Sequence, residues 1–331
     1  VFGLDLSWFF AAYLTVRLLN TVAFFLLAAR AIPGLLARPR FERAPLARLF
    51  RFGKWVTISN LLNPIFAYFD RLWLGHAVDL RAVSHYTGPY QVAERALIIP
   101  ATLASTLFPA VAGLDGAGDL TAMRALSMRA TKLLALGMGL CIVWLVGASG
   151  EVVRLFLGAD YLADSPPILQ LLCCGFFINA LAFVPDSIVQ GRDRPDVTAL
   201  FHLLELPIHL GALAVFVHFW GAFGAALAFC LRVSLDTVLL YWYAAKLGGF
   251  SALEARRGRL PQMLAGLLLA GLCALALSRA QLDVLPRLGL VSGLTGAAAL
   301  ALWRGCLLAS EREEIRGFVR TLHTRILRGN Q

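Results

Sequence analysis

The 331-residue sequence has little charge. Asp, Glu, Lys and Arg make up 15% of it, whereas soluble domains average about 25%. Hydrophobic residues account for 59%, and the mean hydropathy is +0.72. This composition leaves no stretch that fits a soluble domain, and it predicts an integral membrane protein.

Sequence motifs for catalysis and cofactor binding are also missing. There is no glycine-rich phosphate loop and no nucleophile elbow, and a Ser/His/Asp set would have no platform outside the membrane. The six cysteines lie in or beside apolar runs: Cys141, Cys173, Cys174, Cys230, Cys273 and Cys306. We therefore expect buried apolar cysteines, no cofactor, no bound metal and no enzymatic activity.

The net charge of +10 does not indicate a nucleic-acid partner. The basic residues punctuate apolar runs, and they do not form a groove-like cluster with exposed aromatic residues. Nucleic acid is therefore not an expected partner.

Nine apolar runs approach or exceed the roughly 20 residues that a membrane-spanning helix needs. They cover residues 7–32, 53–75, 82–111, 130–149, 166–190, 196–219, 221–245, 261–281 and 285–308. We predict an all-α polytopic membrane protein with about nine transmembrane helices.

The Lys and Arg residues alternate between the connecting segments. With the N-terminus placed outside, 22 of the 30 fall on the cytoplasmic side, four on the opposite side and four within spans. The positive-inside rule therefore places the N-terminus of this chain outside and its C-terminus in the cytoplasm. Because the segment VFGLDLSW has no signal-peptide features, we expect the sequence to begin partway through a longer protein.

Several spans carry polar residues at helical spacing, and such a stripe must face protein or water. These stripes are Tyr13, Arg17 and Asn20; Thr57, Asn60, Asn63 and Asp70; Thr87, Gln91, Glu94 and Thr102; Asn179, Asp186 and Gln190; Thr198, His202, Glu205 and His209; and Arg232, Asp236 and Tyr243. The last two spans have almost none. The pattern predicts that the first seven spans line a polar cavity and that the last two face lipid.

Eight charges lie inside the predicted spans, and each costs about 2.5–3.5 kcal/mol near the bilayer centre unless it finds a partner or water. The cations are Arg17, Arg71, Arg95 and Arg232, and the anions are Asp70, Glu94, Glu205 and Asp236. Mutual pairing is the simple explanation, and Arg232 and Asp236 are spaced for it on one helix. Alternatively, the arginines bind an anionic headgroup and the carboxylates take up a coupling proton or sodium ion.

The spacing His202-x-x-Glu205-x-x-x-His209 places three candidate ligands on one helix face. It does not have the spacing of a zinc-protease helix and no fourth ligand is evident, so we favour a hydrogen-bonded or proton-relay role over metal binding. Nearby, the segment GAFGAA at residues 221–226 predicts a tight turn with close helix packing.

Four segments of the sequence resemble polysaccharide-biosynthesis flippases of the multidrug/oligosaccharidyl-lipid/polysaccharide exporter superfamily. They are RFGKWVTISNLLNPIFAYFDRLWLG, YTGPYQVAERALIIPATLASTLFPA, QGRDRPDVTALFHLLELPIHL and GAFGAALAFCLRVSLDT. The resemblance covers nearly the whole chain and is clearest over residues 50–245. The matching features are order and spacing, so they indicate the family better than the substrate.

The resemblance implies an exporter fold of two six-helix lobes around a cationic cavity, here without the first five helices. Residues 1–32 would be the last helix of the first lobe, 33–51 a basic cytoplasmic linker, 52–247 the second lobe and 248–308 two additional transmembrane helices. Residues 309–331 read as a basic amphipathic tail on anionic lipid of the cytoplasmic surface, or as a solvated tail.

The implied function is the movement of an undecaprenyl-pyrophosphate-linked oligosaccharide across the bacterial inner membrane by alternating access, for O-antigen, capsule or exopolysaccharide synthesis. Arg17, Arg95, Arg232 and Arg71 are the expected substrate-binding residues. Asp70, Glu94, Glu205, Asp236, His202 and His209 are the expected ion-coupling or ion-pair residues. Glycan-assembly proteins are expected as further partners.

Three other interpretations stay open at this point. A cation-coupled drug or small-molecule antiporter of the same superfamily would share these features. A membrane polymerase or ligase of glycan assembly would need a sizeable external loop with catalytic Arg or His, and the external segments here are short. An inactive remnant of a longer transporter is the third.

Overall fold

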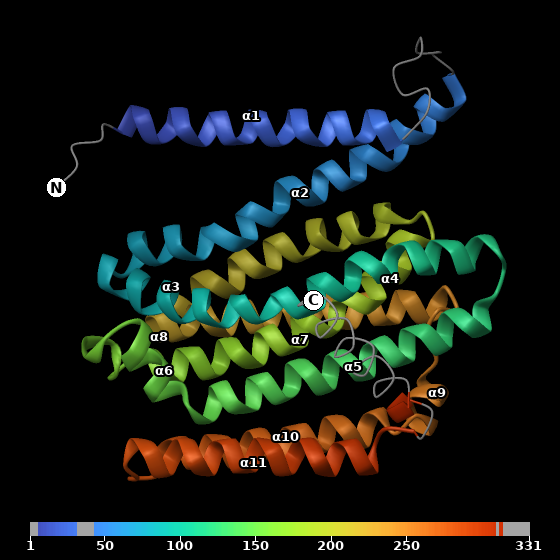
Figure 1. Ribbon diagram of the computed structural model, residues 1–331. Helices are drawn as coiled ribbons and strands as arrows, with labels where there is room; N and C mark the ends of the chain where they lie inside the picture. Colours follow the sequence, from blue (N-terminus) through green and yellow to red (C-terminus); the bar gives the residue numbers. More distant parts are fainter. Residues whose placement is uncertain (1–5, 32–42, 309–310, 314–331) are drawn as a thin grey trace, which may run out of the picture. The chain divides into compact units, whose positions relative to one another are not determined.

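The computed structural model describes residues 6–31, 43–308 and 311–313, and in these residues it contains helices and no strands. Two short 3₁₀ turns, Arg95–Leu97 and Ala159–Tyr161, join α-helices. The α-helices are α1 (Leu6–Ala31), α2 (Arg43–Ala77), α3 (Leu80–Glu94), α4 (Ile98–Gly116), α5 (Leu120–Gly147), α6 (Ser149–Phe156), α7 (Ser165–Gly191), α8 (Pro195–Lys246), α9 (Ala252–Arg257), α10 (Leu260–Arg279) and α11 (Val284–Gly305) (Figure 1). The protein is therefore an all-α polytopic membrane protein, as predicted.

The chain divides into two units, Val1–Arg51 and Phe52–Gln331. The first contains α1, an apolar helix whose membrane-length segment, Phe10–Ala31, has no buried residues within the structure. The predicted linker lies mostly outside the described residues, and the chain is helical again from Arg43. The predicted basic tail also lies outside them, except for the three residues 311–313.

Seven described helical segments are long and apolar enough to cross a membrane. One of them is α8, whose 52 residues would extend about 78 Å if straight, more than twice the roughly 30 Å hydrocarbon core. Another combines α3 and α4, and α2 adds a helix that carries Asp70 and Arg71 in an otherwise apolar segment. Counting α2 and dividing α8 in two places a helix at each of the nine predicted runs.

Gly221 divides α8 into two arms. Its φ of 54° and ψ of −129° lie outside the helical region, and a side chain would be strained there. Three residues later, a Cβ on Gly224 would clash with the backbone carbonyl of Phe216. These two glycines allow the arms to fold back closely, so the turn predicted at residues 221–226 is confirmed.

The α3–α4 segment is continuous except for the 3₁₀ turn at Arg95–Leu97. Pro100 has no N–H with which to reach the carbonyl of Ala96, and its ring crowds that carbonyl. The tighter turn is a common response to such a defect. It lies where the helix passes the polar residues described below.

The core of the second unit is built around α7, which packs against α3, α4, α5, α6 and both arms of α8 (Figure 1). Small residues allow close approach; Gly175, for example, faces the ring of Phe229. The rings of Phe176, Phe229 and Tyr90 pack edge-to-face or tilted, with centroids 4.8–5.6 Å apart. This aromatic cluster fixes α3, α7 and the second arm of α8 to one another.

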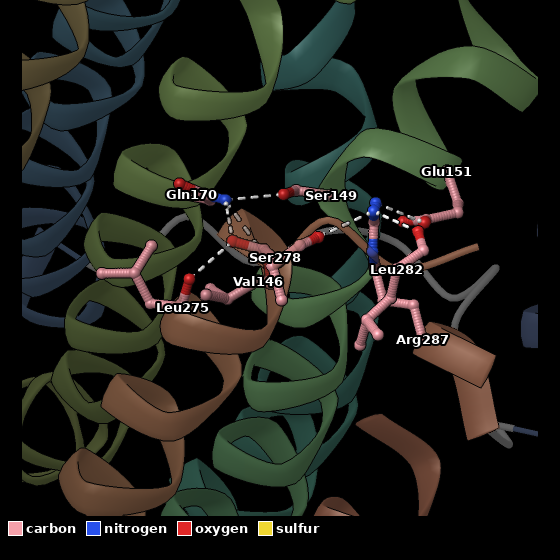
Figure 2. Close-up of polar contacts among 9 residues, drawn as sticks. Val146, Ser149, Glu151, Gln170, Leu275, Ser278, Leu282 and Arg287 are labelled. Carbon is pink, nitrogen blue, oxygen red and sulfur yellow. Dashed lines mark hydrogen bonds and ion pairs between the residues drawn. The ribbon is translucent and has the colours of Figure 1, made fainter. Parts of the chain in front are cut away.

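The helix pair α10 and α11 packs on α5. Polar contacts link each end of this pair to the rest of the unit. Figure 2 shows the contacts at one end: Arg287 donates to Glu151 at 2.9 Å, and Gln170 donates to Ser149 at 2.7 Å and to Ser278 at 3.1 Å. At the other end, the buried Lys132 of α5 contacts Glu311 at 2.6 Å. Polar contacts therefore secure both ends of the pair, although Nε of Arg287 and one oxygen of Glu151 have no hydrogen-bond partner.

Candidate functional site

A polar pocket of about 430 Å³ lies between α2, the α3–α4 segment, α7 and the two arms of α8. Its polar lining residues are Ser59, Asn60, Asn63, Tyr90, Glu94, Asn179, Asp186, Gln190, Thr198, His202, Arg232 and Asp236. These come mostly from the polar stripes that the sequence shows. In the described residues, a polar cavity is thus lined by five of the seven predicted spans, and the span at residues 130–149 does not contribute to it.

Arg232, on the second arm of α8, is the cation of this lining. Its guanidinium lies 4.6 Å from the ring centre of Phe66 and 5.7 Å from that of Phe229. Its buried Nε atom has no hydrogen-bond partner. The side chain is therefore held by aromatic faces, and its donors are not consumed by a direct salt bridge.

The two acids nearest Arg232 are Glu205 and Asp236, which interact electrostatically with it and with each other. Glu205 is completely buried, and both of its carboxylate oxygens lack a hydrogen-bond partner. His202 approaches Asp236 at 3.9 Å, too far for a hydrogen bond. This group of one cation, two carboxyls and an imidazole is loosely paired, which is unusual for buried charge.

Another carboxylate of the pocket lining, that of Asp186, has a hydrogen-bond donor at each of its two oxygens. Asp186 accepts from Gln190 at 2.7 Å and from Thr198 at 3.1 Å, which joins α7 to the start of α8. The sequence placed Asp186 and Gln190 in one stripe, but it did not single them out as site residues. Their spacing of four residues along one helix was the signal in the sequence that could have identified them.

Asp70 closes the bundle beyond the pocket. It accepts from the hydroxyl of Tyr86 at 2.8 Å and pairs with Nε2 of His209 at 2.9 Å, and all three side chains are at most 1% exposed. The contact joins α2, α3 and the first arm of α8. We call these three residues, together with Tyr90, Phe176 and Phe229, the sealed belt.

Two of the other predicted arginines, Arg71 and Arg95, belong to the same unit as Arg232 but do not line this pocket. Arg71 stacks on Tyr68 and Tyr90 at 5.2 and 4.9 Å. Arg95 is exposed and does not line the pocket. Arg17 belongs to the first unit, where it donates to the hydroxyl of Tyr13 at 3.0 Å. The described lining contains one arginine, Arg232, and three carboxyl groups, those of Glu94, Asp186 and Asp236. A positive lining of the complete passage therefore stays a prediction.

The three residues of the predicted His202, Glu205 and His209 face do not share one partner. His209 pairs with Asp70, His202 lies near Asp236, and Glu205 lies near Asp236 and Arg232. The sequence could not reveal the role of Phe66, whose ring contacts Arg232, His202 and His209, because one phenylalanine among 22 carries no distinguishing signal.

A multi-pass helical bundle with a polar pocket and loosely paired charges inside its spans has the features of a membrane transport protein. Residues 8–166 match the family model described as polysaccharide biosynthesis protein. This part of the chain is therefore similar to polysaccharide-biosynthesis proteins, in agreement with the resemblance predicted from the sequence.

Curated relatives point the same way. A putative O-antigen transporter of Shigella flexneri is 35% identical over 198 residues, which are 59% of this chain and 46% of that protein. The lipopolysaccharide biosynthesis protein WzxC of Escherichia coli is 24% identical over 219 residues, 65% of this chain and 42% of that protein. A probable low-salt glycan biosynthesis flippase, Agl15 of Haloferax volcanii, is 20% identical over 207 residues, 62% of this chain and 43% of that protein. The chain spans about half the length of the curated relatives it matches.

Proposed function

We propose that this chain forms part of a flippase that moves a lipid-linked oligosaccharide across a membrane by alternating access, without covalent chemistry. The polar pocket around Arg232 carries this proposal, together with the similarity to proteins named as an O-antigen transporter and a glycan flippase. We take the lipid carrier to be undecaprenyl pyrophosphate and the membrane to be the bacterial inner membrane. Glycan-assembly proteins would deliver and receive the substrate.

The distribution of Lys and Arg supports an orientation for the pocket. It is lined by α2 residues 56–67, by the end of α7 and by the start of α8, all close to the segments richest in Lys and Arg. With those segments in the cytoplasm, the pocket occupies the cytoplasmic half of the bundle. The sealed belt lies beyond it, so the conformation is open inward.

Arg232 is the proposed phosphate-binding residue of this half of the transporter. A guanidinium remains charged in any environment and presents several donors to phosphate oxygens. The rings of Phe66 and Phe229 hold it in place, and Asn60, Asn63 and Gln190 offer hydrogen bonds to a sugar. Glu205 and Asp236 are proposed to bind the coupling proton or sodium ion, since they are buried and loosely paired.

We also propose that residues 52–247 form one lobe of the exporter and that α10 and α11 are the additional pair. Arg17 and Arg95 are proposed as further substrate-binding residues of the complete transporter. The basic C-terminal segment would lie on anionic lipid.

The experiment uses proteoliposomes that contain a fluorescent lipid-linked oligosaccharide. Externally added glycosidase cleaves only outward-facing glycan, so the cleaved fraction reports translocation. We expect Arg232→Gln to abolish translocation at unchanged protein level, because the amide cannot supply the charge. Arg154→Gln is the matched control, since Arg154 is exposed on α6, and it should translocate normally.

Normal translocation by Arg232→Gln would refute the proposed role of the pocket. Uptake of cationic drugs by the wild type, with no movement of glycan, would refute the flippase proposal and favour the antiporter.

A further inference from the structure

A second pocket, of about 470 Å³, lies at the opposite end of the bundle from the pocket around Arg232. Its lining includes Asp79, Arg81, His85, Asp164, Trp220 and Phe223. These residues come from the α2–α3 turn, the start of α7 and the kink of α8. We call it the outer groove, because the proposed orientation places it outside.

The two pockets are distinct. Ala67 of the inner pocket and Val78 of the outer groove, just after the end of α2, are eleven positions apart, which corresponds to about 16 Å of helix. Asp70 and its partners Tyr86 and His209 lie between them. The outer groove is therefore a separate site beyond the sealed belt.

Arg81 and His85 of the outer groove are linked by hydrogen bonds. Arg81 donates from Nε to Nε2 of His85 at 3.3 Å, so this nitrogen accepts and the imidazole proton is on Nδ1. Nδ1 of His85 contacts the hydroxyl of Ser165 at 3.1 Å. The hydrogen bond to His85 orients the Arg81 side chain, and its remaining guanidinium donors face the groove.

The outer groove also contains two carboxylates that can accept hydrogen bonds. Asp79 uses one carboxylate oxygen to cap α3, where it accepts from the amide of Ala82 at 2.6 Å, which leaves its second oxygen as an acceptor. Asp164 is exposed at the start of α7, with one oxygen 3.9 Å from His85. The two carboxylates outnumber the guanidinium of Arg81, so the groove does not favour an anion such as free pyrophosphate.

Aromatic rings complete the lining. The positive φ of Gly221 reverses the chain between Trp220 and Phe223, and these side chains are 54% and 37% exposed. A sugar ring has apolar C–H faces that pack on an aromatic ring and hydroxyl edges that pair with both donors and acceptors. Flat aromatic surface next to Asp and Arg groups suits this combination.

We propose that the outer groove is a carbohydrate-binding site that takes an uncharged sugar residue of the translocated glycan. The proposal rests on the proposed function, since it assigns the groove to the glycan after its passage. Binding there would retain the sugar outside while the inner pocket reloads.

The test is saturation-transfer NMR on the purified protein in a sugar-free detergent, with glucose, galactose, rhamnose, N-acetylglucosamine and glucuronic acid as separate probes. We expect transfer to at least one of the four neutral sugars and weaker transfer to glucuronic acid. Trp220→Ala should weaken binding about tenfold, whereas Trp220→Tyr should retain most of it because the ring is kept.

Trp242→Ala is the matched control, since Trp242 is an exposed tryptophan of the same helix outside both pockets. It should bind like the wild type. Stronger transfer to glucuronic acid than to every neutral sugar would overturn the proposal, as would binding that survives Trp220→Ala. Absence of sugar transfer, combined with quenching of Trp220 by brominated lipid, would also overturn it and assign the groove to the membrane interface.

The inner and outer proposals fail in different ways. Arg232→Gln should lose translocation and keep sugar binding at the outer groove. Wild-type protein that translocates glycan but binds no free sugar would overturn the outer site alone. Trp220-dependent sugar binding without any translocation would overturn the proposed function and support the groove as a sugar site.

Discussion

Two regions of the second unit pair their buried charges to different extents. Around the inner pocket, Arg232, Glu205 and Asp236 have no ion-pair partner at hydrogen-bonding distance among the described residues, and each keeps a donor or acceptor without a hydrogen-bond partner. Where α10 and α11 meet the bundle, Lys132 contacts Glu311 at 2.6 Å and Arg287 contacts Glu151 at 2.9 Å, although Nε of Arg287 and one oxygen of Glu151 lack a hydrogen-bond partner. A buried charge without a close ion-pair partner is costly in a membrane and indicates a ligand site, whereas a close ion pair indicates attachment.

The largest effect on stability is expected at the Lys132–Glu311 pair. Lys132→Met leaves Glu311 as a nearly buried carboxylate without its partner, which should lower the free energy of unfolding by about 3–5 kcal/mol. Thermal denaturation in detergent measures the effect. The double variant with Glu311→Gln should recover most of the loss, and a single variant as stable as the wild type would contradict the attachment role.

A smaller effect is expected at the other end of the helix pair. Arg287 also donates to the backbone carbonyls of Ala280 and Leu282, at 3.0 and 2.7 Å. Because a fifth of its side chain is exposed, Arg287→Leu should cost about 2 kcal/mol. Arg279→Leu, at an exposed position of α10, is the control and should change the melting temperature little. Equal shifts for the two variants would show that the contacts in Figure 2 add nothing.

Apolar packing of the same pair gives the third prediction. A Cβ on Gly139 would lie 2.6 Å from the side chain of Leu267, whereas a Cβ on Gly137 meets nothing within 4 Å. Gly139→Ala should therefore cost about 1–2 kcal/mol through overpacking, and Gly137→Ala should be neutral or slightly stabilising. Comparison of their melting temperatures checks this, and the reverse order would contradict the packing of α5 on α10.

The smallest effect on stability is expected at the pocket itself. Glu205→Gln removes a buried carboxyl that has no hydrogen-bond partner, so stability should rise or stay within about 1 kcal/mol of the wild type. Translocation should nevertheless fall, because the coupling group is lost. A melting temperature lowered as much as in Lys132→Met would show that Glu205 is structurally paired, and the contrast between the two regions would disappear.

Local signals in the sequence were sufficient for the helical architecture. The apolar runs, interrupted by turn residues, correspond to the helices, and the glycines at 221 and 224 marked the reversal within α8. These features follow from lipid, which requires each segment to satisfy its own backbone hydrogen bonds. Polar spacing also indicated which spans would line a pocket.

The pairing of individual charges needed the tertiary structure. The sequence left open whether Asp70, Arg71, Arg232 and Asp236 pair with one another or bind substrate and ion. The fold pairs Asp70 with His209 and Tyr86 and places Arg232 against two phenylalanine rings. It also brings Trp220, Asp79 and Asp164 to one groove from segments up to 141 positions apart. Which side chain meets which depends on how rotated and tilted helices pack, and the spacing within a single helix does not contain that information.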